Sequence, residues 1–234
     1  MPRRPKTSIV SSIFQASLRA GFLRAYHGLE VDPHKYLHKF RKANRLPIQT
    51  WSDMFNIDEA EVNRHANRVI RSATRAAALE GAGLGLGGML TILPDAGILS
   101  AITVRMLQKL SLIYGFEYKS EDEVAELWLA AASAAGLDLG RDFMEKQAVE
   151  RLVPRIIDRI ALRVGAEVAE KWSGRLIPLL SSGIGGTLNY YFVRAWGRRA
   201  QRHFYERHHT VRIRGLRDPR VLNLSPHARL HTAD

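Results

Sequence analysis

The sequence lacks cysteine altogether, so disulfide bonds and thiol chemistry are excluded. Acidic residues are scarce, because 35 Lys and Arg stand against 23 Asp and Glu and give a formal net charge of +12. The first residues, MPRRPKTSIVSSIFQAS, lack the sustained apolar core of a signal peptide, and none is expected. The basic excess predicts an anionic partner, which is either a phospholipid surface or a nucleic acid.

Enzyme motifs are missing as well. The chain contains no G-x-S-x-G, H-E-x-x-H or phosphate-binding loop motif. It does spell G-x-G-x-x-G at Gly83, Gly85 and Gly88. A dinucleotide site needs a strand before this motif and an acidic residue about 20 positions after it, whereas residues 62–79 have helical periodicity and no such acid follows. We therefore expect no cofactor and no catalytic residues.

A metal site is not expected either. His34 and His38 lie four residues apart, a spacing that suits two ligands on one helix, but no third ligand accompanies them. The histidines near His208 belong to a basic segment and do not follow a known ligand spacing.

Two apolar stretches, residues 79–115 and 176–199, are rich in glycine. Glycines four residues apart allow two helix backbones to approach closely, so both stretches are expected at tightly packed helix contacts. Either they form a buried seam in the core or they insert into a bilayer. Residues 81–104 are long enough to span one, but Pro94 and Asp95 interrupt them, which favours a buried hairpin. The glycines assigned to close packing are Gly81, Gly83, Gly85, Gly87, Gly185 and Gly186.

Three polar residues within these stretches are candidates for burial. Asp95 is the one acid of the first stretch, and beside Pro94 it is expected to cap a helix, with a proton or cation site as the alternative. Asn189 and Tyr190 belong to the second stretch, and they need hydrogen-bond partners if they are buried.

The remaining segments have helical periodicity. Residues 9–27 predict an amphipathic helix, and Asp58 is expected to cap a long helix whose arginines lie largely off its apolar face. We therefore predict an all-α fold, a single helical domain built around two glycine-rich apolar helical hairpins. Residues 1–55 are expected to form a basic helical region that packs on the core, residues 56–210 the main domain, and residues 211–234 an extended tail.

Two basic segments interleaved with aromatic residues are candidates for the anionic partner. This composition suits lipid headgroups and equally suits nucleic-acid phosphates or a solvated helix face. The residues assigned to lipid or partner binding are Lys35, Lys39 and Arg41 in the first segment, and Arg194, Trp196, Arg198, Arg199 and Arg202 in the second.

Two motifs resemble the signature of the EcsC family. They are EGAGLGLGGMLTILPDAGILSAITVRMLQKLSLIYGF and, further on, SGRLIPLLSSGIGGTLNYYFVRAWGRRAQRHF. The resemblance spans roughly residues 56–204. It implies a bacterial, helical protein that is cytoplasmic or peripheral to the membrane, and it supplies no catalytic residues.

Together these features favour a non-enzymatic protein at the inner face of the cell membrane. It is expected to bind anionic lipid or a membrane-transporter partner through the basic aromatic helix. The alternatives are a nucleic-acid-binding helical protein and a lipid-acting enzyme without a recognisable motif.

Overall fold

The computed structural model describes residues 9–28, 31–84, 92–118, 121–137, 149–173 and 182–217, and every regular element in these ranges is a helix. The chain is a single all-α domain, as predicted. Its elements are α1 (Ile9–His27), α2 (Pro33–Asn44), the 3-10 helix η1 (Trp51–Asn56), α3 (Glu59–Leu84), α4 (Ile92–Ile113), α5 (Glu121–Ala134), α6 (Val149–Ser173) and α7 (Ser182–Arg217).

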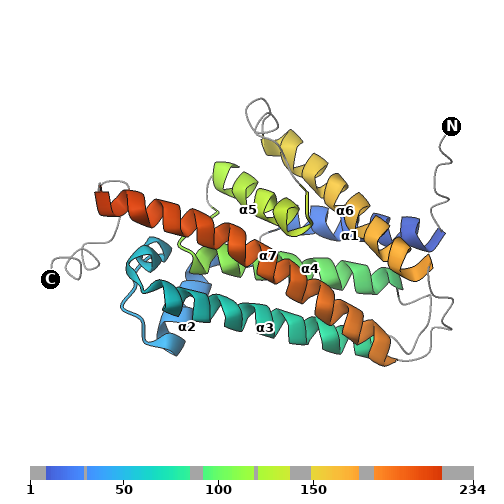
Figure 1. Ribbon diagram of the computed structural model, residues 1–234, viewed down its shortest axis with the longest axis horizontal. Helices are drawn as coiled ribbons and strands as arrows, with labels where there is room; N and C mark the ends of the chain where they lie inside the picture. The colour runs from blue at the N-terminus through green and yellow to red at the C-terminus, as the bar shows by residue number, and fades with distance from the viewer. Residues whose placement is uncertain are drawn as a thin grey trace.

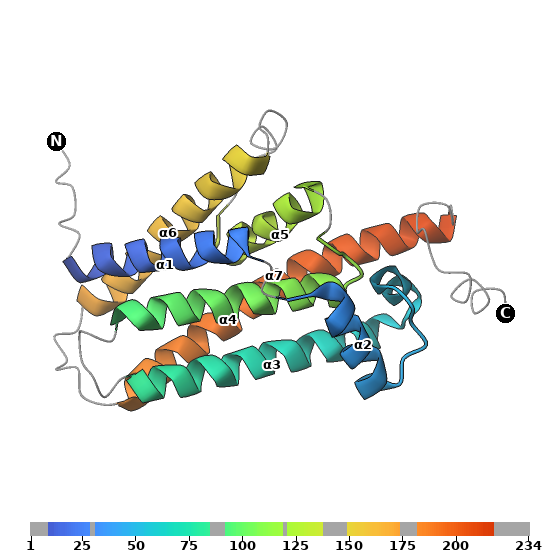
Figure 2. The ribbon, with the colours of Figure 1, turned by 180° about the vertical axis from the view of Figure 1, so that it is seen from behind.

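The long helices form two layers. Figure 2 shows α1, α4 and α3 side by side in one layer, with α4 in the middle, and α6, α5 and α7 behind it. Helix α7 runs along α3 from the second layer and also packs on α4 and α5 (Figure 1). Helix α7 is the longest helix, and the layers also meet where α6 packs on α1.

Local sequence signals set several helix ends. The Asp58 carboxylate accepts hydrogen bonds from the backbone N–H groups of Ala60 and Glu61, which caps α3 as predicted. Helix α4 ends where Gly115 adopts a φ of +89°, and the N–H of Phe116 then donates to the carbonyl of Ser111. Only glycine takes this backbone conformation without strain, so the end of α4 is fixed at this residue.

The core contains an aromatic cluster where the two layers meet. The ring of Phe22 in α1 stacks on Trp196 in α7 at 5.9 Å and meets Trp128 in α5 edge-on at the same distance. Since these residues come from three helices far apart in sequence, the cluster ties α1 into the same core as α5 and α7.

Glycine does permit close helix contacts, at positions other than those predicted. A Cβ atom on Gly197 would lie 2.9 Å from Ile70 of α3 and 3.0 Å from the sulfur of Met106 of α4. A Cβ atom on Gly21 would lie 2.7 Å from Ser100, where α1 meets α4. Among the glycines within helices whose surroundings are described, Gly21 and Gly197 therefore have the closest contacts with a neighbouring helix.

The predicted glycine-rich hairpins are only partly described. Gly81 and Gly83 lie near the end of α3, and Gly185 and Gly186 lie in the first turns of α7, but their surroundings, like Gly85 and Gly87 entirely, are outside the described residues. Within the described ranges, no helix is both long enough and apolar enough to cross a bilayer.

Two boundaries differ from the prediction. Helix α4 begins at Ile92, so Asp95 lies within its first turn and is not the residue that precedes the helix. The Asp95 side chain is outside the described residues. Helix α7 continues to Arg217, and Arg212 donates a 2.8 Å hydrogen bond to the carbonyl of Ile57, so the segment after residue 210 starts as packed helix.

Candidate functional site

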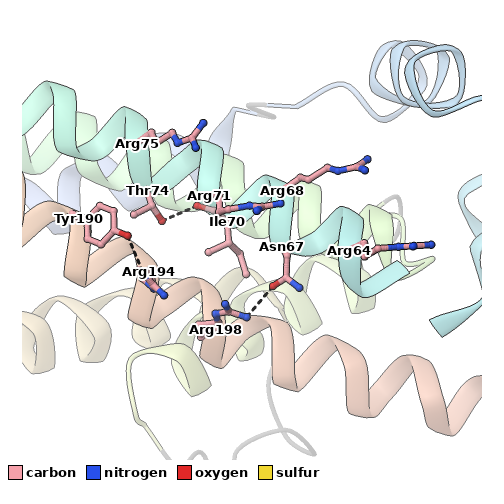
Figure 3. Close-up of a pocket in the computed structure, with 10 residues that line it drawn as sticks. All are labelled: Arg64, Asn67, Arg68, Ile70, Arg71, Thr74, Arg75, Tyr190, Arg194 and Arg198. Atoms are coloured by element: carbon pink, nitrogen blue, oxygen red, sulfur yellow. Dashed lines mark hydrogen bonds between the residues drawn. The ribbon is translucent and has the colours of Figure 1, made fainter. Parts of the chain in front are cut away.

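A groove of about 440 Å³ lies between α3 and α7 and is lined mainly by arginine (Figure 3). None of the residues that line it is acidic. We call it the arginine groove. Its lining residues are Arg64, Asn67, Arg68, Ile70, Arg71, Thr74 and Arg75 of α3, with Tyr190, Arg194 and Arg198 of α7.

The α3 arginines follow the helical repeat. Their successive spacings of four, three and four residues place Arg64, Arg68, Arg71 and Arg75 along one stripe of the helix surface. No Asp or Glu occurs in residues 62–79, so the acids of α3 lie only near its two ends, at Glu59, Glu61 and Glu80. The middle of the arginine stripe therefore has no carboxylate of its own helix beside it.

Helix α6 provides a contrast. It also has arginines four residues apart, but Glu150, Asp158 and Glu167 are placed among them. Asp158 forms an ion pair with Arg19 of α1. The arginines of α6 thus belong to mixed-charge contacts of the kind that cover ordinary helix surfaces, whereas those of α3 do not.

Helices α3 and α7 run antiparallel and face each other through pairs of side chains that recur every three or four residues. We call these facing pairs rungs. At three successive rungs a hydrogen bond joins the two helices. These bonded pairs are Tyr205 with Glu59 (3.0 Å), Gln201 with Asn63 (3.5 Å) and Arg198 with Asn67 (2.8 Å).

The same register continues toward the end of α3, but the chemistry changes. Continuing this register, the next positions are Arg71 of α3 with Arg194 of α7, and then Arg75 with Tyr190, and all four residues line the arginine groove. Among the described residues, neither Arg71 nor Arg75 has a hydrogen-bond or ion-pair partner. Like charges that line one groove repel each other, so this end of the groove is the part whose positive charge is least compensated.

Two groove arginines are held in place. The Nη1 atom of Arg194 donates a 2.7 Å hydrogen bond to the Tyr190 hydroxyl, with its guanidinium 5.8 Å from the ring centre, as Figure 3 shows. Arg198 is fixed by its bond to Asn67. Since the Tyr190 oxygen accepts from Arg194, its own proton remains to be donated, and no acceptor for it lies among the described residues.

The Thr74 hydroxyl, in contrast, already donates its proton to the carbonyl of Ile70 at 2.7 Å.

Exposed apolar side chains border this basic face. Leu79, one turn beyond Arg75, is 75% exposed and lines a second hollow on the outer side of α3 together with Arg71 and Arg75. Tyr191 is 64% exposed and its ring meets Tyr190 edge-on at 5.5 Å. Large exposed apolar groups beside clustered cations are typical of surfaces that rest on a membrane interface.

The structure brings only part of the predicted binding set together. Arg194 and Arg198 line the arginine groove, but Arg199 donates instead to the carbonyl of Ala134 at 3.0 Å. Arg202 is exposed and does not line the groove. Trp196 does not belong to the binding surface, because it is 3% exposed and its ring stacks in the core.

The first basic segment lies on α2, apart from the arginine groove. Lys35 is 3.7 Å from the Asp32 carboxylate, and Arg41 donates to Gln49 at 3.1 Å. Lys39 is exposed. None of these three lines the groove.

The polar candidates fall in different environments. Asn189 is buried, and Tyr190 is half-buried at the edge of the groove.

The arginines of α3 were the residues that sequence reasoning missed. They were recognised as lying off the apolar face of their helix, but a charged outer face is the ordinary state of an amphipathic helix. The signal that distinguishes them is the absence of acids in residues 62–79, matched by a similar absence in α7, where Glu206 is the first acid. Two arginine-rich stretches without acids indicate a shared site only once their helices are known to pack together.

These observations define an all-α protein with an arginine-lined groove between two of its helices. The chain belongs to the EcsC protein family, whose family model matches residues 11–208. The resemblance seen in the two motifs is thereby confirmed, and the match extends well upstream of residue 56.

A curated relative supports the same membership. The chain is similar to Protein EcsC of Bacillus subtilis (strain 168), with 29% identity over 190 residues that cover 77% of this chain and 78% of the relative. No solved structure matches the chain.

Proposed function

We propose that this protein binds the surface of anionic membranes as a peripheral protein, through the face of α3 and α7 that holds the arginine groove. The observation that carries the proposal is the groove itself, where six arginines and no acid line one hollow. Guanidinium groups bind phosphate through paired N–H donors and retain their charge at all physiological pH values, so this lining suits lipid headgroups.

The magnitude of the attraction is sufficient for reversible binding. A basic residue near an anionic bilayer contributes about 1 kcal/mol, so six in one hollow contribute several kcal/mol before orientational costs. The attraction decays over about 10 Å at ordinary ionic strength, so binding is expected to weaken steeply as salt is raised. Leu79 and Tyr191 at the border of the groove add an apolar contribution that salt does not screen.

The test is co-sedimentation of the purified chain with vesicles. Neutral phosphatidylcholine vesicles are compared with vesicles that also contain phosphatidylglycerol, at low and at high salt. The arginine-groove variant is Arg71→Gln combined with Arg194→Gln. The matched control, Lys39→Gln with Lys42→Gln, removes the same charge from exposed positions on α2.

We expect salt-sensitive binding to the anionic vesicles, lost in the groove variant and retained in the control. Equal losses in both variants would show that net charge alone governs binding and would overturn the proposed site. Absence of binding to any vesicle would overturn the membrane proposal. Duplex DNA is included as a competitor, and preferential binding to DNA would favour the nucleic-acid alternative instead.

A further inference from the structure

The positions of Arg71 with Arg194 and of Arg75 with Tyr190, which we call the open rungs, differ from the rest of the groove because no hydrogen bond among the described residues joins α3 to α7 there. Arg198 is paired with Asn67, and Arg68 donates to Asn44 of α2 at 3.0 Å. Arg71 and Arg75, in contrast, have no partner among the described residues, and Arg194 is held only by Tyr190 of its own helix. Arg64 has no partner among the described residues either, but it lies toward the other end of the groove, whereas Arg71, Arg75 and Arg194 lie together at this end.

These donors share a chemistry. Three guanidinium groups present forked N–H pairs, and the Tyr190 hydroxyl has a proton to donate once its oxygen has accepted from Arg194. No carboxylate lies among the side chains at these rungs, so they offer no partner for a cation. The complementary ligand is a compact group with several anionic oxygens, which is the description of a phosphate.

The charge at the rungs selects between kinds of phosphate. A phosphodiester carries one negative charge and two non-bridging oxygens, whereas a phosphomonoester carries three terminal oxygens and a charge between about −1.5 and −2 at neutral pH. A single negative charge would neutralise only one of the three neighbouring arginines, and the other two would still repel each other. The second charge and third oxygen of a monoester match three forked donors more completely.

We propose that Arg71, Arg75 and Arg194, with the Tyr190 hydroxyl, form a site that prefers a terminal phosphomonoester headgroup of a membrane lipid over a phosphodiester headgroup. This inference rests on the proposed function and specifies which headgroup the groove selects. The remaining groove arginines attract the anionic surface in general, and the open rungs provide the discrimination.

The test compares two vesicle compositions at equal surface charge. One contains phosphatidic acid, whose headgroup is a monoester, and the other contains enough phosphatidylglycerol to give the same measured zeta potential. Wild-type protein is expected to bind the phosphatidic acid vesicles about tenfold more tightly, the change that one well-placed charge-assisted hydrogen bond commonly gives. Soluble glycerol 3-phosphate, added as a competitor, shows whether the headgroup alone is recognised or only in a bilayer.

A charge-conserving variant separates geometry from attraction. Arg71→Lys combined with Arg194→Lys keeps the charge but removes the forked donors, so binding to phosphatidylglycerol should persist while the tenfold preference disappears. Tyr190→Phe should reduce the preference without changing the net charge.

The possible failures are distinguishable. Equal binding of wild-type protein to both compositions would overturn this inference and leave the proposed function standing. A preference that survives in the lysine variant would also overturn it, because the forked donors would then be irrelevant. Absence of binding to either composition would overturn the proposed function itself.

Discussion

Gly197 is the residue at which α7 comes closest to α3 and α4. The space that a side chain would need is filled by Ile70, whose Cγ2 atom is branched from a rigid Cβ, and by the sulfur of Met106. Gly97 in α4 provides the opposite case, because a Cβ atom there would have no neighbour within 4 Å. The two glycines therefore separate the effect of close packing from that of helix propensity.

We predict that Gly197→Ala lowers the free energy of unfolding by about 1–2 kcal/mol, because the added methyl group displaces Ile70 in a packed core. Gly97→Ala should raise it by about 0.5–1 kcal/mol, because alanine is the better helix former. Urea denaturation measures both. Equal effects of the two substitutions would contradict the assignment of Gly197 as a close contact.

His208 is a buried titratable residue that is held in the core as the neutral imidazole. Its Nδ1–H donates to the carbonyl of Tyr114 at 2.9 Å, its ring stacks on Phe55, and its Nε2 atom has no partner among the described residues. Burial lowers the pKa of His208, an effect that the bond to Tyr114 only partly opposes. Burial likewise lowers the pKa values of His65 and His203.

We predict that the free energy of unfolding falls as the pH is lowered from 7.5 to 5. In this range the unfolded chain takes up protons at a histidine pKa near 6.5, whereas His65, His203 and His208 take them up less readily in the folded chain, so protonation favours unfolding. The substitution His208→Phe preserves the stacking and removes one titrating group, so its denaturation midpoints should depend less on pH. An unchanged pH dependence in this variant would contradict the burial of a neutral imidazole.

At the scale of elements, the contact between α3 and α7 differs between its two ends. Hydrogen bonds join the helices along the first three rungs, whereas arginines of both helices line the groove beyond them. Like charges without acids beside them lower the stability of the free protein, which is the cost expected of the anion site proposed above.

We predict that Arg71→Glu stabilises the protein and abolishes binding to anionic vesicles. Replacing one of two facing cations by an anion changes repulsion into attraction, which should raise the free energy of unfolding by about 0.5 kcal/mol. Urea denaturation at low salt measures the gain, and it should diminish in about 0.5 M NaCl because salt screens exposed pairs. A clear loss of stability would contradict the facing register of Arg71 and Arg194.

At the scale of the whole molecule, the arginine groove and the exposed apolar residues share one face. Leu79 lies beside Arg71 and Arg75, and Tyr191 contacts Tyr190, whereas Leu162, which is 59% exposed, belongs to α6, which contributes no residue to the groove. In the proposed binding mode, α3 and the first half of α7 lie toward the membrane, and α1 lies at the far edge of the first layer (Figure 2).

We predict that Leu79→Gln weakens binding to anionic vesicles about three- to tenfold, because the loss of an inserted leucine removes about 1 kcal/mol of apolar transfer free energy. Leu162→Gln is the matched control and should leave binding unchanged. Vesicle titration monitored by tryptophan fluorescence measures both. A similar loss in the control would contradict the proposed orientation.

Much of the fold is predictable from the sequence because its signals are local. The periodicity of residues 9–27, the Asp58 cap and the Gly115 stop each depend on neighbours within one or two turns. The groove depends on which helices pair, and no local pattern states that α3 lies along α7. For the same reason Trp196 resembled an interfacial aromatic, since its stacking partner Phe22 lies in a helix far away in the sequence.

The most direct measurement of the central claim uses the absence of cysteine, which allows one spin label to be placed at a chosen position. Ser72 is exposed on the outer face of α3 beside Arg71, and Ala20 is exposed on α1, across α4 from α3. With anionic vesicles, a label introduced by Ser72→Cys should become protected from a water-soluble relaxation agent, and one at Ala20→Cys should stay accessible. Protection at Ala20 without protection at Ser72, or at neither position, would contradict membrane contact through the arginine groove.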